Sequence, residues 1–174
     1  MELNDVASFE INKAVYINNV SLIESGALYM IQTYNTIYST YYYLTYDTTN
    51  KVFKLEAEST PSKNNVFLFH RDDTKGGGVS SSYRNVSAGA WRNMAAISGE
   101  HDGFIKEDLS AGNESEAAYF TCANGWGSAT SRDIDMYLGT TGQFFYYRDD
   151  RQLYWGTDGN YYKWKWVIYP VTPQ

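Results

Sequence analysis

The chain has 174 residues, enough for one compact domain, and carries a formal charge of −6 at pH 7. This acidic balance repels phosphate and argues against nucleic-acid and anionic-membrane partners. The single cysteine, Cys122, excludes an internal disulfide bond. The first residues lack the features of a secretion signal and no apolar run is long enough to span a bilayer, so we expect a soluble, cytoplasmic protein.

The composition predicts an all-β protein. Seventeen tyrosines and five tryptophans supply large rings for a core, each with a polar group. Strong helix formers such as leucine are scarce, whereas turn-forming Ser, Asn and Gly and strand-forming aromatic residues are abundant.

Alternation of apolar and polar residues indicates strands along the chain. In residues 52–58, for example, Phe53, Leu55 and Ala57 share one face, and charged side chains occupy the other. In chain order, the predicted strands are 14–18, 27–33, 42–46, 52–58, 66–70, 91–97, 104–108, 118–122, 136–138, 144–148 and 162–168.

A faint internal repeat links these strands. A strand, a turn, an aromatic strand, a loop and a further aromatic strand follow one another from Tyr43 and again from Met94. A less regular third copy begins at Tyr137, continues through 144–147 and ends at 164–168. A unit with one apolar face cannot bury that face alone, whereas three units can bury their faces together.

This pattern resembles the β-trefoil, and in particular trefoil lectins and agglutinins. The resemblance implies a single domain, 1–174, with repeats at roughly 27–75, 76–125 and 126–174. Residues 1–26 are an N-terminal extension or supply an opening strand that pairs with the C-terminal one. Another antiparallel barrel or a β-sandwich is the alternative fold. The chain lacks the Gln-x-Trp motif of the ricin-B branch, so the sugar-binding positions of that branch cannot be transferred.

Catalytic and metal-binding patterns are weak. Cys122 lies in a predicted strand, where a free cysteine is commonly a small buried residue. Adjacent acids such as Asp72 and Asp73 point to opposite faces of a strand. The glycines at 76–78 are not followed by the Lys-Ser/Thr of a phosphate-binding loop. We therefore expect no enzymatic activity, no cofactor and no metal.

Loops that combine a ring with amide and carboxylate groups carry the functional prediction. A sugar presents an apolar C–H face and a rim of hydroxyls, so its site needs a ring for stacking and a few polar partners. In residues 154–161, Trp155 is the predicted stacking ring, with Asp158 as acceptor and Asn160 as amide partner. Altogether, the predicted carbohydrate-binding residues are Trp155, Asp158, Asn160, Tyr154, Trp126, Asn124, His70 and Asp73.

The tyrosine-rich segment 41–46 must present rings on both faces of its strand. We expect half of these rings to lie outside the core, where they stack on a ligand, form a homodimer face or remain an exposed surface.

The leading hypothesis is a non-enzymatic lectin that binds glycans or glycoproteins. A protease inhibitor with a protruding loop, at 58–62 or 75–79, is the second hypothesis, because some trefoil families inhibit proteases. A receptor-targeting subunit of a toxin is the third. The sequence has no basic amphipathic segment, so no direct membrane insertion is expected.

Overall fold

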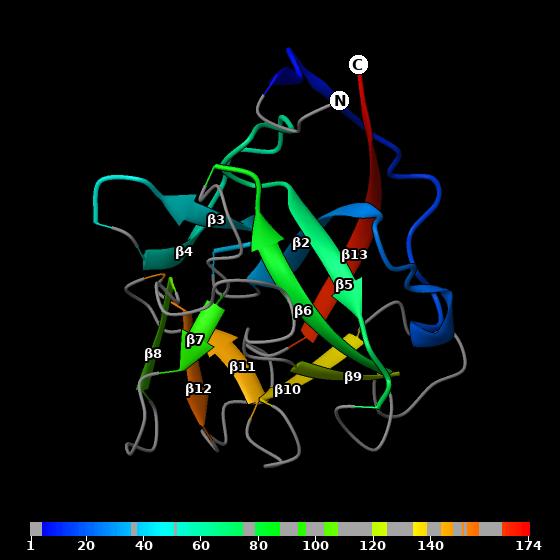
Figure 1. Cartoon of the computed structure of the whole chain (residues 1–174). Helices are drawn as coiled ribbons and strands as arrows, with labels where there is room; N and C mark the ends of the chain where they lie inside the picture. The colour runs from blue at the N-terminus through cyan, green and yellow to red at the C-terminus, as the bar shows by residue number, and fades with distance from the viewer. Residues whose placement is uncertain are drawn as a thin grey trace.

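The fold was obtained as a computed structural model, and it is built almost entirely from antiparallel strands (Figure 1). The structure describes residues 5–35, 38–50, 52–74, 79–87, 94–96, 103–107, 120–124, 134–138, 144–147, 151, 153–156 and 165–174. Within them lie the 3-10 helix η2 (Val20–Leu22) and the strands β1 (Phe9–Ile11), β2 (Leu28–Asn35), β3 (Thr40–Asp47), β4 (Val52–Glu56), β5 (Phe67–Arg71), β6 (Val79–Asn85), β7 (Met94–Ala96), β8 (Gly103–Glu107), β9 (Phe120–Asn124), β10 (Ile134–Leu138), β11 (Phe144–Tyr147), β12 (Leu153–Gly156) and β13 (Lys165–Pro173).

Six of these strands pair with one another in a closed cycle. β2 pairs with β5, β5 with β6, β6 with β9, β9 with β10, β10 with β13, and β13 with β2 again. A cycle of this kind leaves no free sheet edge, because each strand has a neighbour on both sides.

Three hairpins extend from this cycle. β3 pairs with β4, β7 with β8, and β11 with β12. β8 also pairs with both β4 and β12, so the hairpins are joined to one another. In Figure 1 they lie to the left of and below β5 and β6. The prediction of an all-β antiparallel protein is confirmed.

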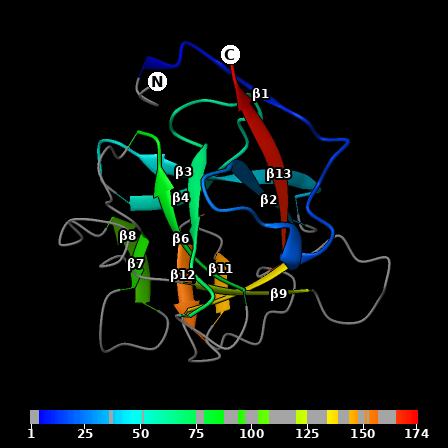
Figure 2. The same ribbon diagram turned by 45° about the vertical axis from the view of Figure 1, so that its right-hand side comes forward.

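The N-terminal segment differs from its prediction. Residues 14–18 form no strand; instead β1 pairs with β13, with Phe9 opposite Pro173. Figure 2 shows β1 beside β13 near both chain ends. Ile17 still reaches β13, because its backbone N–H donates to the carbonyl of Ile168 at 2.9 Å. Val15 is exposed. The alternation of Val15 and Ile17 resembles a strand in the sequence. Within the described residues, however, this segment makes only one backbone hydrogen bond to β13, and a strand pairing needs several in succession.

Two further strands were missed by the sequence prediction. β6 contains three consecutive serines, which gave no apolar alternation. β12 lies in the segment predicted as a loop, because Tyr154 and Trp155 precede turn-forming residues. Tyr137, which was predicted to begin the third copy of the repeat, lies in β10 and pairs with Phe144 of β11.

Two apolar clusters form the core of the described part. In residues 28–33 of β2 and 42–44 of β3 both strand faces are buried, because each face meets a different cluster. The first cluster contains Ile17, Val20, Ile23, Tyr29, Ile31, Tyr42, Leu44, Tyr46, Phe53, Leu55, Phe67, Phe69, Cys122, Trp166 and Ile168. The second contains Val6, Phe9, Leu28, Met30, Tyr43, Val66, Val86 and Val171.

The N-terminal segment therefore covers what would otherwise be an outer face of β2 and β3. This explains why the expectation for segment 41–46 is wrong: Tyr42, Tyr43 and Tyr46 are all buried, and Tyr41 alone is exposed. Cys122 is buried, as predicted for a free cysteine in a strand.

Candidate functional site

The outer end of the β2–β3 hairpin carries a cluster of exposed tyrosines. Tyr34 and Tyr41 are cross-strand partners, and their ring centroids lie 4.8 Å apart with the planes inclined at 52°. They are 41% and 55% exposed, and Tyr38 in the intervening turn is 59% exposed. We call these three residues the tyrosine tip. They make up most of the large exposed apolar side chains among the described residues.

Local structure fixes the tyrosine tip. The antiparallel register of β2 and β3 places Tyr34 directly opposite Tyr41, on the same face of the hairpin. In the turn, Ser39 has a positive φ of 50°, and the Thr40 hydroxyl donates to the Tyr38 carbonyl at 2.9 Å. Two adjacent rings with hydroxyl groups offer an apolar stacking surface beside donors and acceptors. This combination is what a sugar needs from its site.

At the inner end of the same hairpin, by contrast, the tyrosine hydroxyls are buried and hydrogen-bonded within the protein. The Gln32 side chain donates from Nε2 to the Tyr43 hydroxyl at 2.8 Å, and its Oε1 accepts from the Tyr169 hydroxyl at 3.1 Å. All three side chains are buried. This network satisfies the polar groups of the inner end, and it leaves the tyrosine tip as the part of the hairpin that is open to a ligand.

Of the residues predicted from the sequence, Tyr154 and Trp155 lie in β12. Trp155 pairs with Phe145 on one side and with Gly103 on the other, so the loop placement of both residues is wrong. The backbone of Asn124 ends β9, opposite Ile134. Three more predicted residues, Asp158, Asn160 and Trp126, lie outside the described residues.

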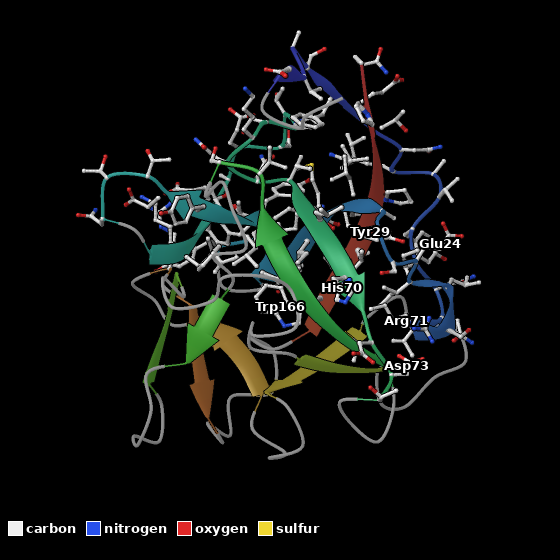
Figure 3. All side chains as sticks on the ribbon, viewed as in Figure 1. Glu24, Tyr29, His70, Arg71, Asp73 and Trp166 are labelled. Carbon is white, nitrogen blue, oxygen red and sulfur yellow. The ribbon has the colours of Figure 1, made fainter. Side chains whose placement is uncertain are left out.

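His70 and Asp73 lie at the end of β5, where the structure surrounds Arg71 with partners (Figure 3). Arg71 donates from Nε and Nη2 to the Asp73 carboxylate, at 2.8 Å for the shortest bond. Its Nη1 donates to the carbonyls of Ser21 and Ile23 at 3.0 and 2.8 Å. The hydrogen bonds that Arg71 donates to the Asp73 carboxylate raise the pKa of Arg71. The pair thus fastens the η2 segment to β5, a structural role that sequence reasoning did not find.

A second rigid surface feature is the loop between β4 and β5. The Asn65 side chain is buried at its base, accepts from the backbone N–H of Ser62 at 2.8 Å and donates to the Thr60 carbonyl at 3.0 Å. The Glu58 carboxylate accepts from the Thr60 backbone N–H at 2.7 Å, which lowers the pKa of Glu58. Residues 57–60 are exposed above this brace.

Charged side chains near the β3–β4 turn form hydrogen bonds and ion pairs that stabilise the turn. The carboxylate of Asp47 accepts from the backbone N–H groups of Thr49 and Asn50 and from the Asn50 side chain, which lowers its pKa. Lys54 lies 3.3 Å from Asp47 and 3.0 Å from Glu56. The bond with Glu56 is the main cause of the raised pKa of Lys54.

Metal-ligand clusters and membrane-spanning helices are both absent from the described residues. They contain no group of three or more His, Cys, Asp or Glu side chains able to hold a metal ion. Nor does any helix in this part of the chain have the length and apolar character of a membrane span.

The tyrosine tip was not predicted as a unit. Tyr34 and Tyr38 fell between two predicted strands: the first ended too early, at residue 33, and the second began too late, at residue 42. The usable signal was the near-symmetric placement of Tyr34 and Tyr41 about a short turn, which is typical of a cross-strand pair in a hairpin.

Comparisons with known proteins add a fold and no sequence family. No family model matches the chain, and no curated protein matches it. The structure is similar to that of a ricin B-like lectin from Macrolepiota procera, solved in complex with lactose, with a TM-score of 0.58 and 15% identity. The match covers 84% of this chain and 96% of the lectin. The chain is therefore an all-β protein whose fold is similar to that of a ricin B-like lectin.

Proposed function

We propose that this chain is a β-trefoil of three four-stranded repeats that binds carbohydrate without catalysis. Three units of four strands, β2–β5, β6–β9 and β10–β13, each contribute two strands to the closed cycle and one hairpin beside it. That arrangement supports the trefoil assignment. The similar fold of a lectin supports the functional class.

The observation that carries the proposal is the exposed ring pair of Tyr34 and Tyr41. Neighbouring exposed aromatic side chains form the kind of surface that marks an interaction site. Sugar C–H groups stack on such rings, and the phenol hydroxyls at their edges bond the sugar hydroxyls. The residues predicted around Trp155 and Trp126 remain predictions of further sites on the same protein.

A glycan array followed by haemagglutination tests this function. The intact chain is expected to bind a defined set of glycans, and Tyr34→Ala with Tyr41→Ala is expected to weaken that binding at least tenfold. Val15→Ala is the matched control, because Val15 is as exposed as Tyr41 but lies away from the hairpin. A parallel Trp155→Ala variant assigns the loss to one site or the other. Absence of glycan binding by the intact chain would refute the function.

The braced loop at 57–62 favours a second candidate, inhibition of a protease. A loop that enters an enzyme cleft binds tightly when it is held rigid before binding. The buried Asn65 holds Thr60 and Ser62 from below, while residues 57–60 face solvent. Titration against serine and cysteine proteases distinguishes the two functions, because an inhibitor abolishes activity stoichiometrically and a lectin leaves it unchanged.

A further inference from the structure

A pocket of about 460 Å³ opens beside η2, where the start of β2 meets β13. Its volume lies in the range of small-molecule sites. Most of its wall is aliphatic, and it includes Leu22, Leu68 and Val171. The polar side chains at its wall are Glu24 and Tyr29. Figure 3 shows both on the side of the molecule where Arg71 and Asp73 also lie.

Tyr29 is 3% exposed, yet its hydroxyl makes a single hydrogen bond within the part of the chain that the structure describes. In that bond the oxygen accepts from the backbone N–H of Glu24 at 3.0 Å. A phenol has a second lone pair and a proton to donate. Tyr29 is among the residues that line the pocket, and a buried polar group with unused hydrogen-bonding capacity favours a ligand that carries a polar group.

The local charge selects the sign of the ligand. Among the described residues that line the pocket, Glu24 is the only acidic or basic one. Burial is the main cause of the raised pKa of Tyr29. Arg71 is also neutralised by its ion pair with Asp73 at 2.8 Å. The field at the polar end of the pocket is therefore negative, as is the chain as a whole.

We propose that this pocket binds a small organic ammonium with an apolar body. The apolar body occupies the aliphatic wall, and the ammonium donates to the second lone pair of the Tyr29 hydroxyl beside the Glu24 carboxylate. An anion is disfavoured by Glu24. A sugar is a poor fit, because the wall is aliphatic and offers no exposed ring face for stacking. This site is independent of the proposed glycan site on the tyrosine tip.

Three isosteric probes test the proposal: 2-phenylethylammonium, 2-phenylethanol and phenylacetate, each titrated into the intact chain by calorimetry and by NMR. The ammonium is expected to bind saturably and at least tenfold more tightly than the alcohol, with no detectable binding of phenylacetate. Glu24→Gln is expected to remove this tenfold preference while leaving the alcohol affinity unchanged. Glu24 is exposed, so the variant keeps its fold, which its thermal unfolding curve verifies.

Glu58→Gln is the matched control, because Glu58 is an equally exposed acid away from the pocket. It is expected to leave all three affinities unchanged. The proposal is overturned if the ammonium does not bind saturably, if phenylacetate binds as tightly as the ammonium, or if Glu24→Gln and Glu58→Gln have the same effect.

Discussion

The two ends of the β2–β3 hairpin use the same residue type for opposite purposes. At the inner end Tyr43 is 2% exposed, and Gln32 donates a hydrogen bond to its hydroxyl. At the outer end Tyr41 projects beside Tyr34 into solvent. The difference comes from what covers each end, because the N-terminal segment packs Val6 and Phe9 over the inner end. A tyrosine in a strand thus becomes part of the core or of the exposed surface according to its distant neighbours.

Tyr43→Ala should cause the largest change in this comparison. It removes a buried ring from the second cluster and leaves the Gln32 amide without its acceptor, at a cost of about 4 kcal/mol in the free energy of unfolding. Urea unfolding followed by tryptophan fluorescence measures this loss. A loss below about 1 kcal/mol would show that the inner end is not part of the core.

Phe9→Ala tests whether the N-terminal segment is what buries the inner end of the hairpin. Phe9 is buried in the second cluster and belongs to β1, so its truncation should cost about 3 kcal/mol. Hydrogen exchange should then show faster exchange at the backbone amides of β1. Val15→Ala, at an exposed position of the same segment, should leave both stability and exchange unchanged.

Asp47→Asn probes the turn that follows the inner end. The hydrogen bonds from Asn50 and Thr49 favour the ionised carboxylate, so its loss should cost about 1 to 2 kcal/mol at pH 7. Because the folded pKa is lowered, Asp47 stabilises the native state above the unfolded pKa of about 3.9. That contribution is lost as the pH falls through the folded pKa. Urea midpoints of the two proteins should therefore converge on acidification below about pH 4, and a constant difference would contradict this account.

Tyr41→Ala should have the smallest effect on folding, under about 1 kcal/mol, because it removes an exposed cross-strand pair. Under the proposed function, glycan affinity should nevertheless fall at least tenfold. Thermal unfolding and glycan binding measured on the same preparation separate the two effects. A large stability loss without any change in binding would make the tyrosine tip a structural element.

Part of the fold could be predicted from local pattern. Phe53 and Leu55 are buried while Lys54 and Glu56 are only partly so, as the alternation in β4 requires. Trp166 and Ile168 follow the same rule in β13. Strand β6 was not predicted, because its serines give no apolar alternation. Its strand conformation comes instead from its pairing with β5 and β9.

The candidate site was less predictable than the fold. Trp155 and its neighbours drew attention because rings and turn-forming residues adjoin there, yet Trp155 is paired on both sides within β12. The pocket beside η2 had no sequence signal, because its wall comes from segments as distant as Leu22, Leu68 and Pro170. The sequence shows which aromatic and polar side chains lie near one another along the chain. Strand pairing decides which of them come together in the folded protein.

By itself the sequence determined the strand-rich class, the absence of an internal disulfide and the apolar faces of the regular strands. These properties follow from composition and from the two-residue period of a strand, which are local. Tertiary structure decided the closed pairing of six strands, the burial of Tyr43 and the exposure of Tyr41. The physical reason is that each of these depends on which distant segment covers a strand face. A side chain on that face is buried only when the covering segment packs against it.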